Sequence, residues 1–240
     1  MATIRVITDS AADLPQEIAN RLKIDIVPLS VRFGDQEFVD GKDLTPAEFW
    51  VKCKASAELP ETAAPSPGAF QEAYLKAKAE GADGVVVVAL SSDLSATHQS
   101  ATLAAQAVAD QIPVKIVDSR AVTMAEGMIA IDLAERAAAG ASLEDLVARG
   151  TELAGKVGVC GTIDTLEHLI KGGRLKGAKA IFGSMLSIKP LLELQGGLVA
   201  KRDERALVRR LSRPSLLRLK RLGPLTVLRS PTEPLLMLTS

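Results

Sequence analysis

The fold class follows from one segment in the first half of this 240-residue chain, Gly84-Val85-Val86-Val87-Val88-Ala89-Leu90-Ser91-Ser92-Asp93-Leu94-Ser95. Its first seven residues form a continuous apolar run, which is typical of a strand buried on both faces. A hydroxyl-rich loop follows, and small residues from about Ala96 to Ala109 then predict a helix. A buried strand that leads through a short loop into a helix is the repeating unit of a parallel α/β sheet.

The same alternation extends in both directions along the chain. β-Branched and apolar runs predict further strands at residues 3–7, 24–33 and 114–117. Capping residues, prolines and terminal glycines predict helices from about residue 15, from residue 45, over residues 66–81 and over residues 121–139. We therefore predict an α/β fold whose N-terminal part is a doubly wound, mostly parallel sheet.

The pattern changes after about residue 155. Residues 157–162 resemble a strand, residues 166–170 a short helix, and residues 188–200 a hairpin around Gln195-Gly196-Gly197. This mixture predicts a smaller α+β second domain. We place the first domain at residues 1–152, an incomplete second domain at 153–204 and an atypical tail at 205–240.

Composition narrows the class of protein. The chain is 47% hydrophobic and only 3% aromatic, so stacking platforms for single-stranded nucleic acid are not expected. Two cysteines predict no disulfide framework, and two histidines leave little for a His/Cys metal cluster. The longest apolar run is too short to span a bilayer, and the N-terminus lacks the layout of a signal peptide. These features predict a cytoplasmic protein without a metal or cofactor.

The net charge of zero is the sum of two unlike parts. Residues 205–240 carry eight Lys or Arg against the single acid Glu233, a net charge of +7, so residues 1–204 carry −7. Four prolines and irregular apolar spacing interrupt any helix in this tail. We interpret it as a frame-shifted or truncated end, and the alternative is a basic arm that binds nucleic acid or a membrane.

Hydroxyl groups gather where the predicted strands end. Ser10, the segment Ser91–Ser95 and Ser119 each follow a strand, and the loop from Thr62 to Ser66 precedes a helix. Ligands of open α/β sheets bind at the carboxyl ends of the strands, and a helix start favours an anion. Each hydroxyl could instead be an ordinary helix cap. Their convergence favours a site that holds an oxyanion.

The sequence indicates an enzyme less strongly than it indicates an anion-binding site. The chain has no Gly-rich phosphate loop and no nucleophile elbow. An α/β hydrolase or phosphotransfer enzyme using Ser95 or His98 remains the alternative, although no acid–base partner is evident for either. Arg174, after two glycines, could place a guanidinium beside an anion.

Segments spread over residues 1–204 resemble the DegV family of bacterial fatty-acid-binding proteins. The resemblance is carried, in this order, by Thr8–Pro15, Pro28–Val31, Asp40–Gly41, Thr62–Gly68, Ser91–Ala101, Val117–Arg120, Leu166–Leu169, Lys171–Arg174 and Ile188–Leu192. The resemblance stops near Arg205, whereas family members continue for some tens of residues. This chain also has no His beyond His168.

The resemblance implies two domains with a long-chain fatty acid between them and no catalysis. Thr62 and Ser95 match the residues that hold the carboxylate in the family, and Ala96 stands where the family usually has Gly. We expect Ser10, Ser66, Ser119 and Arg174 to support this site. The implied partners are the fatty acid and a separate fatty-acid kinase in phospholipid metabolism. No nucleic acid and only transient membrane contact are expected.

Overall fold

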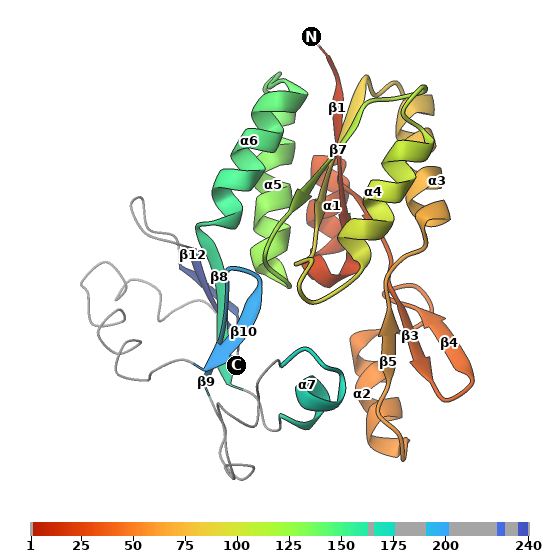
Figure 1. The fold of residues 1–240 in the computed structure, drawn as a ribbon, viewed down its shortest axis with the longest axis vertical. Coiled ribbons are helices and arrows are strands. Elements are labelled where there is room, and N and C mark those ends of the chain that lie inside the picture. The colour runs from red at the N-terminus through yellow and green to blue at the C-terminus, as the bar shows by residue number, and fades with distance from the viewer. Residues whose placement is uncertain (1, 163–165, 176–190, 202–224, 229–234, 240) are drawn as a thin grey trace, which may run out of the picture.

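The computed structural model describes residues 2–162, 166–175, 191–201, 225–228 and 235–239 (Figure 1). Its first sheet contains β1 (Ile4–Asp9), β2 (Asp25–Val27), β6 (Gly84–Ala89) and β7 (Val114–Asp118) in the order β2-β1-β6-β7. All neighbouring pairs are parallel. Every residue of β6 is buried, as its apolar run predicts. The predicted parallel sheet is therefore confirmed.

Helices cover both faces of this sheet (Figure 1). Val86 and Val88 face a core shared with α1 (Gln16–Leu22), α5 (Met124–Ala138) and α6 (Leu143–Ala154). Val85 and Val87 face a second core with α3 (Pro67–Ala79) and α4 (Thr97–Ala107). Adjacent residues of one strand thus serve opposite cores, because side chains alternate across a strand. The fold is doubly wound, as predicted.

A small module is inserted between β2 and α3. It contains β3 (Ser30–Phe33), β4 (Gln36–Val39) and β5 (Glu61–Ala63) in an antiparallel sheet, together with α2 (Pro46–Ala55). The prediction of one strand over residues 24–33 is wrong, since the chain leaves the first sheet after Val27 and β3 belongs to another sheet. Pro28, which has no N–H to donate, lies at the break.

The second sheet lies beyond α6. Its order is β10-β9-β8-β12-β11, with β8 (Val157–Thr162), β9 (Leu191–Gln195), β10 (Leu198–Lys201), β11 (Leu225–Leu228) and β12 (Leu235–Thr239). The short helix α7 (Glu167–Lys171) is present as predicted, and so is the hairpin, although residues 188–190 of its predicted range lie outside the described residues. This sheet with α7 provides the predicted smaller α+β part.

Two features here depart from the sequence analysis. The tail contributes β11 and β12 to the second sheet, and β12 pairs in parallel with β8. Each strand is a short apolar run that directly follows a proline, a pattern obscured by the many arginines of the tail. Helix α6 was not anticipated either, although Ser142 and Asp145 form a capping box at its start. This helix runs through residue 152, where the first domain was predicted to end.

The strand order determines where a ligand can reach the first sheet. The chain leaves β1 toward β2 on one side, whereas it leaves β6 toward β7 on the other. The carboxyl ends of β1 and β6 therefore flank a topological switch point, where ligands of open α/β sheets bind. The hydroxyl-rich loop after β6 is located at this point. No helix in the described ranges has the length and hydropathy needed to cross a membrane.

Candidate anion-binding site at the start of α4

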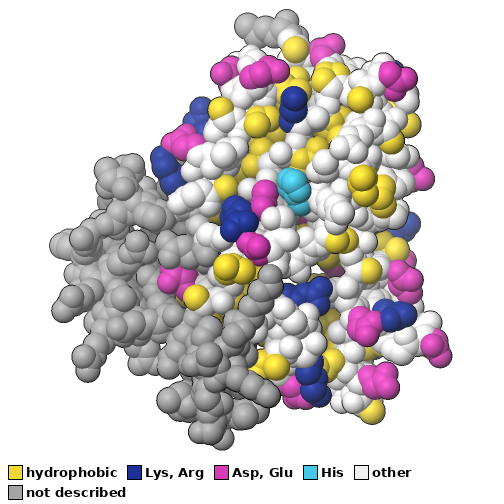
Figure 2. Space-filling model, in the orientation of Figure 1, with side chains coloured by type: hydrophobic (Ala, Val, Ile, Leu, Met, Phe, Trp, Pro, Cys, Tyr) yellow, Lys and Arg dark blue, Asp and Glu magenta, His cyan; other side chains and the backbone are white. Residues whose placement is uncertain are grey.

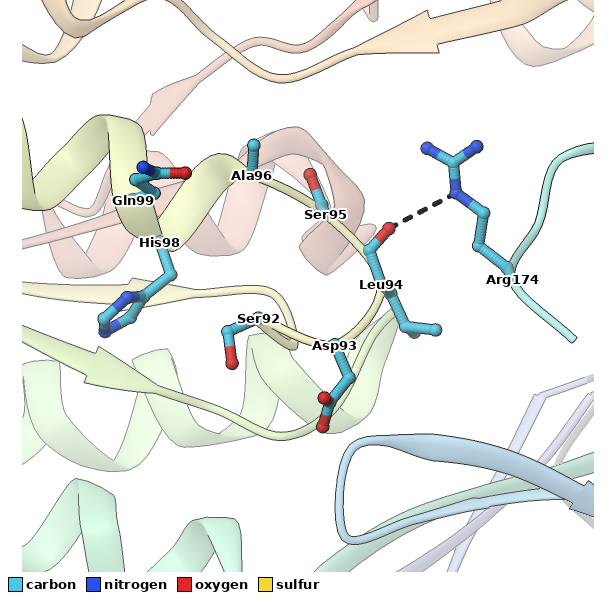
Figure 3. A pocket seen from close by; sticks show the side chains of 8 residues that line it. All are labelled: Ser92, Asp93, Leu94, Ser95, Ala96, His98, Gln99 and Arg174. Carbon is cyan, nitrogen blue, oxygen red and sulfur yellow. Dashed lines mark hydrogen bonds between the residues drawn. The ribbon is translucent and has the colours of Figure 1, made fainter. Parts of the chain in front are cut away.

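An open hollow of about 420 Å³ lies beside the loop after β6. Figure 3 shows that the loop and the first turn of α4 form one wall and Arg174 the other. The residues that line it are Ser92, Asp93, Leu94, Ser95, Ala96, His98, Gln99 and Arg174. Three of the predicted site residues, Ser95, Ala96 and Arg174, therefore come together.

The positive end of α4 opens into this hollow. Ala96 is the N-cap residue and supplies no side-chain cap, and the first turn of α4 contains no acidic residue. Ser95 partly compensates, because its Oγ accepts a hydrogen bond from the Thr97 N–H at 3.2 Å and lies 2.9 Å from Thr97 Oγ1. The first N–H groups of a helix have no partner within the helix, so they attract an anion.

Arg174 adds a cation from the second part of the chain. Its side chain is exposed, and its Nε donates to the Leu94 carbonyl oxygen at 3.3 Å. Its Nη1 donates to the Gly172 carbonyl oxygen at 2.6 Å. In Figure 3 the guanidinium and the Ser95 hydroxyl extend to the same side of the loop. A carboxylate or phosphate between them would meet a hydroxyl, helix N–H groups and a guanidinium.

His98 points away from this arrangement. Figure 3 shows its ring on the opposite side of the helix start from the Ser95 hydroxyl, on the side to which Ser92 and Asp93 also extend. A general base must come within hydrogen-bond reach of the nucleophile it activates. Ser95 and His98 therefore do not form the nucleophile–base pair that the alternative enzyme would need.

The other four predicted residues lie elsewhere, and three of them have hydrogen-bond partners there. Ser10 Oγ accepts from the Leu29 N–H at 3.0 Å, and buried Ser119 donates to the Ala121 carbonyl oxygen at 3.2 Å. Ser66 is the N-cap of α3, where its Oγ accepts from the Ala69 N–H at 3.1 Å. Thr62 is exposed on β5, in the inserted module. None of the four lines the hollow.

A buried pair of carboxyl groups was not identified from the sequence. Asp9, which is 1% exposed, accepts from the Leu90 N–H and the Ala11 N–H, both at 2.9 Å. Burial raises the pKa of Asp9 to about 6. Burial and then the charge of Asp9 raise the pKa of Glu126 well above its usual value. Glu126 Oε1 accepts from Thr8 Oγ1 at 3.1 Å, whereas its Oε2 has no hydrogen-bond partner among the described residues.

The pair supports the strand end from which the loop of the site begins. Because Asp9 accepts from Leu90, it fixes the end of β6 from which the loop begins. The described residues contain no group of three His, Cys, Asp or Glu side chains able to hold a metal ion. Sequence reasoning missed Glu126 because its helix position alone gives no sign that it faces the end of β1.

The surface around the site carries charges of both signs. In Figure 2, acidic and basic side chains are interspersed over the described part of this face. Arg120 is one of the basic residues near the loop, since its Nη1 lies 2.8 Å from Asp93 Oδ2. It too was not singled out from the sequence.

Comparisons with known proteins agree with the sequence resemblance. A DegV domain-containing protein of Listeria innocua is 38% identical over 189 residues, which cover 79% of this chain and 66% of that protein. A structure described as fatty acid binding of a DegV family protein from Thermus thermophilus has a TM-score of 0.75 and 36% identity, covering 84% of this chain and 71% of that one. The DegV of Bacillus subtilis, described as a fatty acid binding protein, has a TM-score of 0.77 and 31% identity, covering 88% and 76%.

The extent of these matches shows to which family the chain belongs. The chain spans about two thirds of the length of the curated relatives, 66% and 69% for two of them. The family profile described as "Uncharacterised protein, DegV family" matches residues 3–210, and its end lies close to the residue where the sequence resemblance stops. Since this match covers most of the sequence, the chain belongs to the DegV family.

Proposed function

We propose that the protein binds a long-chain fatty acid whose carboxylate lies at the start of α4. The observation that carries this proposal is the open hollow in which the Ser95 hydroxyl, the first N–H groups of α4 and Arg174 meet. Relatives that are 36% and 31% identical are described as fatty-acid-binding. A carboxylate has the charge and the acceptor atoms that this set of donors complements.

The acyl chain supplies most of the affinity in this proposal. It would lie between the two domains, where each methylene removed from water contributes about 0.8 kcal/mol. The head-group contacts then fix the orientation of the ligand. Thr62 takes part only if the inserted module brings β5 toward α4 when the ligand binds. Its contribution is therefore tested separately from that of Ser95.

The proposal assigns binding rather than catalysis to this chain. The opposite directions of Ser95 and His98 support this assignment. A carboxylate held at an open hollow stays accessible to a second protein, which agrees with presentation of the acid to a fatty-acid kinase. We place the protein in the cytoplasm in this role.

Native mass spectrometry with lipid extraction tests the proposal. We expect purified protein to carry an acyl chain, or to take one up from added oleic acid. Folded protein that neither carries nor takes up a fatty acid would rule the proposal out.

The head-group site is tested by Ser95→Ala. A hydrogen bond to a charged group contributes about 1.5–3 kcal/mol, so we expect the oleic acid affinity to fall roughly 10- to 100-fold. The matched control is Ser100→Ala, which removes a hydroxyl from the next turn of α4 outside the hollow. A Thr62→Ala variant measures the part played by β5. Unchanged affinity in Ser95→Ala would place the carboxylate elsewhere.

A further inference from the structure

We propose that the tip of the β9–β10 hairpin, through Gly197 and its partner Arg120, positions the loop that carries Ser95. The second sheet would then control the shape of the carboxylate site. This inference rests on the proposed fatty-acid binding, and Gly197 and Arg120 act in it as positioning residues rather than as ligand contacts.

The hairpin tip has a conformation that requires glycine. Residues Gln195 and Leu198 pair across a two-residue turn, in which Gly196 has φ +60° and Gly197 has φ +88°. Positive φ at both positions is typical of the tight turns that match the twist of a hairpin. The two glycines differ in their surroundings, because Gly196 is exposed whereas Gly197 is buried.

The buried Gly197 contacts Ser91, at the start of the loop that carries Ser95. Ser91, which is fully buried, donates from its Oγ to the Gly197 carbonyl oxygen at 2.9 Å. Arg120 donates from Nη2 to the Gly196 carbonyl oxygen. Its Nη1 lies 2.8 Å from Asp93 Oδ2, so one guanidinium joins the hairpin to the loop. In Figure 3 the hairpin ribbon lies on the side of the loop to which Asp93 points.

Backbone hydrogen bonds connect Ser91, which the hairpin contacts, to Ser95. The Ser91 carbonyl oxygen accepts from the Leu94 N–H at 2.9 Å and from the Ser95 N–H at 3.2 Å. The Ser91 Oγ also accepts from the Asp93 N–H at 3.3 Å. A shift of Ser91 would therefore move the turn that places the Ser95 hydroxyl at the start of α4.

A side chain at Gly197 would force Arg120 or Ser91 to move. A Cβ at this position would lie 2.7 Å from Arg120 Cζ and 2.8 Å from Ser91 Oγ. A Cβ at Gly196 would meet nothing within 4 Å, although its φ is also positive. Alanine at either site carries the same kind of backbone strain, but only alanine at Gly197 collides with the two residues that hold the loop.

This contrast provides a matched pair of variants in the full-length chain. We expect Gly197→Ala to lower the affinity for oleic acid by about tenfold or more, which corresponds to losing one charge-assisted contact. Gly196→Ala should change it by less than about threefold, because the strain it adds is local to the turn. Amide hydrogen exchange should become faster at residues 92–95 in Gly197→Ala and stay unchanged there in Gly196→Ala.

Arg120 variants separate positioning from a general loss of stability. Arg120→Ala should weaken binding, and it should reduce the further effect of Gly197→Ala because the colliding group is gone. Arg120→Lys keeps the charge beside Asp93 and should restore part of the affinity. The midpoint of thermal unfolding is measured for every variant. If Gly197→Ala and Arg120→Ala bind oleic acid like the unaltered protein, the inference is wrong.

The hydrogen-exchange measurement distinguishes failure of this inference from failure of the proposed function. If the unaltered protein takes up no fatty acid, the proposed function fails, yet faster exchange at residues 92–95 in Gly197→Ala still shows that the hairpin holds the loop. Unchanged exchange in that variant overturns the positioning role whatever the ligand.

Discussion

At the scale of single residues, the buried carboxyl pair makes stability depend on pH. The folded pKa of Asp9 is about 6, above its ordinary value of 3.8. Between about pH 4 and pH 6 the unfolded chain therefore releases a proton that the folded chain keeps, so the free energy of unfolding falls as the pH rises. Asp9 contributes up to roughly 3 kcal/mol to this fall. Asp13, whose pKa burial and Asp40 raise to about 6, acts in the same direction.

Glu126→Gln tests this dependence. The amide resembles the neutral acid that burial favours, so the variant should be more stable than the unaltered protein at pH 8 and should lose stability less steeply as the pH rises. Urea unfolding at several pH values measures both effects. The control is Glu135→Gln, which changes an exposed carboxyl on the same helix. Parallel profiles for the unaltered protein and Glu126→Gln would show that Glu126 is already ionised.

The sequence predicts part of the site at this scale. Ser95 and Ala96 could be placed because a loop after a buried strand leads directly into a helix, and Arg174 came from its own short motif. The contacts of Thr62, Ser10, Ser66 and Ser119 could not be foreseen, since any hydroxyl near a helix start or a turn can satisfy a nearby backbone group instead. Glu126 and Arg120 become visible only when residues about 30 to 120 positions apart are brought together.

At the scale of elements, close packing of α6 on the first sheet gives a further prediction. A Cβ at Gly150 would lie 3.0 Å from Val117 Cγ2 and 3.2 Å from Leu133 Cδ1. Alanine favours a helix by about 1 kcal/mol over glycine, but overpacking a core costs about 1–3 kcal/mol. Both neighbours are buried and have little space to move, so Gly150→Ala should lower the free energy of unfolding.

The control for this prediction is Gly155→Ala, at the end of the same helix. There the nearest atom to a Cβ is the Glu152 carbonyl oxygen at 3.6 Å, an ordinary contact. Chemical denaturation of the two variants compares tight packing with open space. A Gly150→Ala variant as stable as Gly155→Ala would mean that α6 moves away from the sheet at little cost.

Most elements with strong local signals were predicted correctly, and α6, whose capping box was overlooked, is the exception. The apolar run of β6 and the capping box of α2 each specify one structure through neighbouring residues alone. The split between β2 and β3 was missed because it depends on which sheet each segment joins. The strands of the tail were missed for the same reason, since their place beside β8 depends on distant residues.

At the scale of the whole molecule, the second sheet depends on the tail. Deleting residues 205–240 removes β11 and β12 and leaves β8 at an edge of the sheet. We expect this deletion to lower the midpoint of thermal unfolding and to weaken oleic acid binding, because the sheet that bears the hairpin loses two strands. Calorimetry and ligand titration measure these losses.

The same deletion tests the alternative hypothesis that the tail is a basic arm that binds nucleic acid. If the tail binds nucleic acid, the full-length chain should bind DNA with a strong dependence on salt, and the deletion should abolish that binding. If the tail serves the second sheet, DNA binding should be absent from both proteins while only the deletion loses stability.

The contact between Ser91 and Gly197 also has a consequence for protein synthesis. The two residues are 106 positions apart. At about 5–20 residues per second, the ribosome adds the intervening residues in roughly 5–20 seconds. In the last part of this interval, once α6 has been made, the first domain of a nascent chain has the loop but not the hairpin that contacts it. The first domain can therefore fold on the ribosome before the contact that restrains the loop at the proposed binding site has formed.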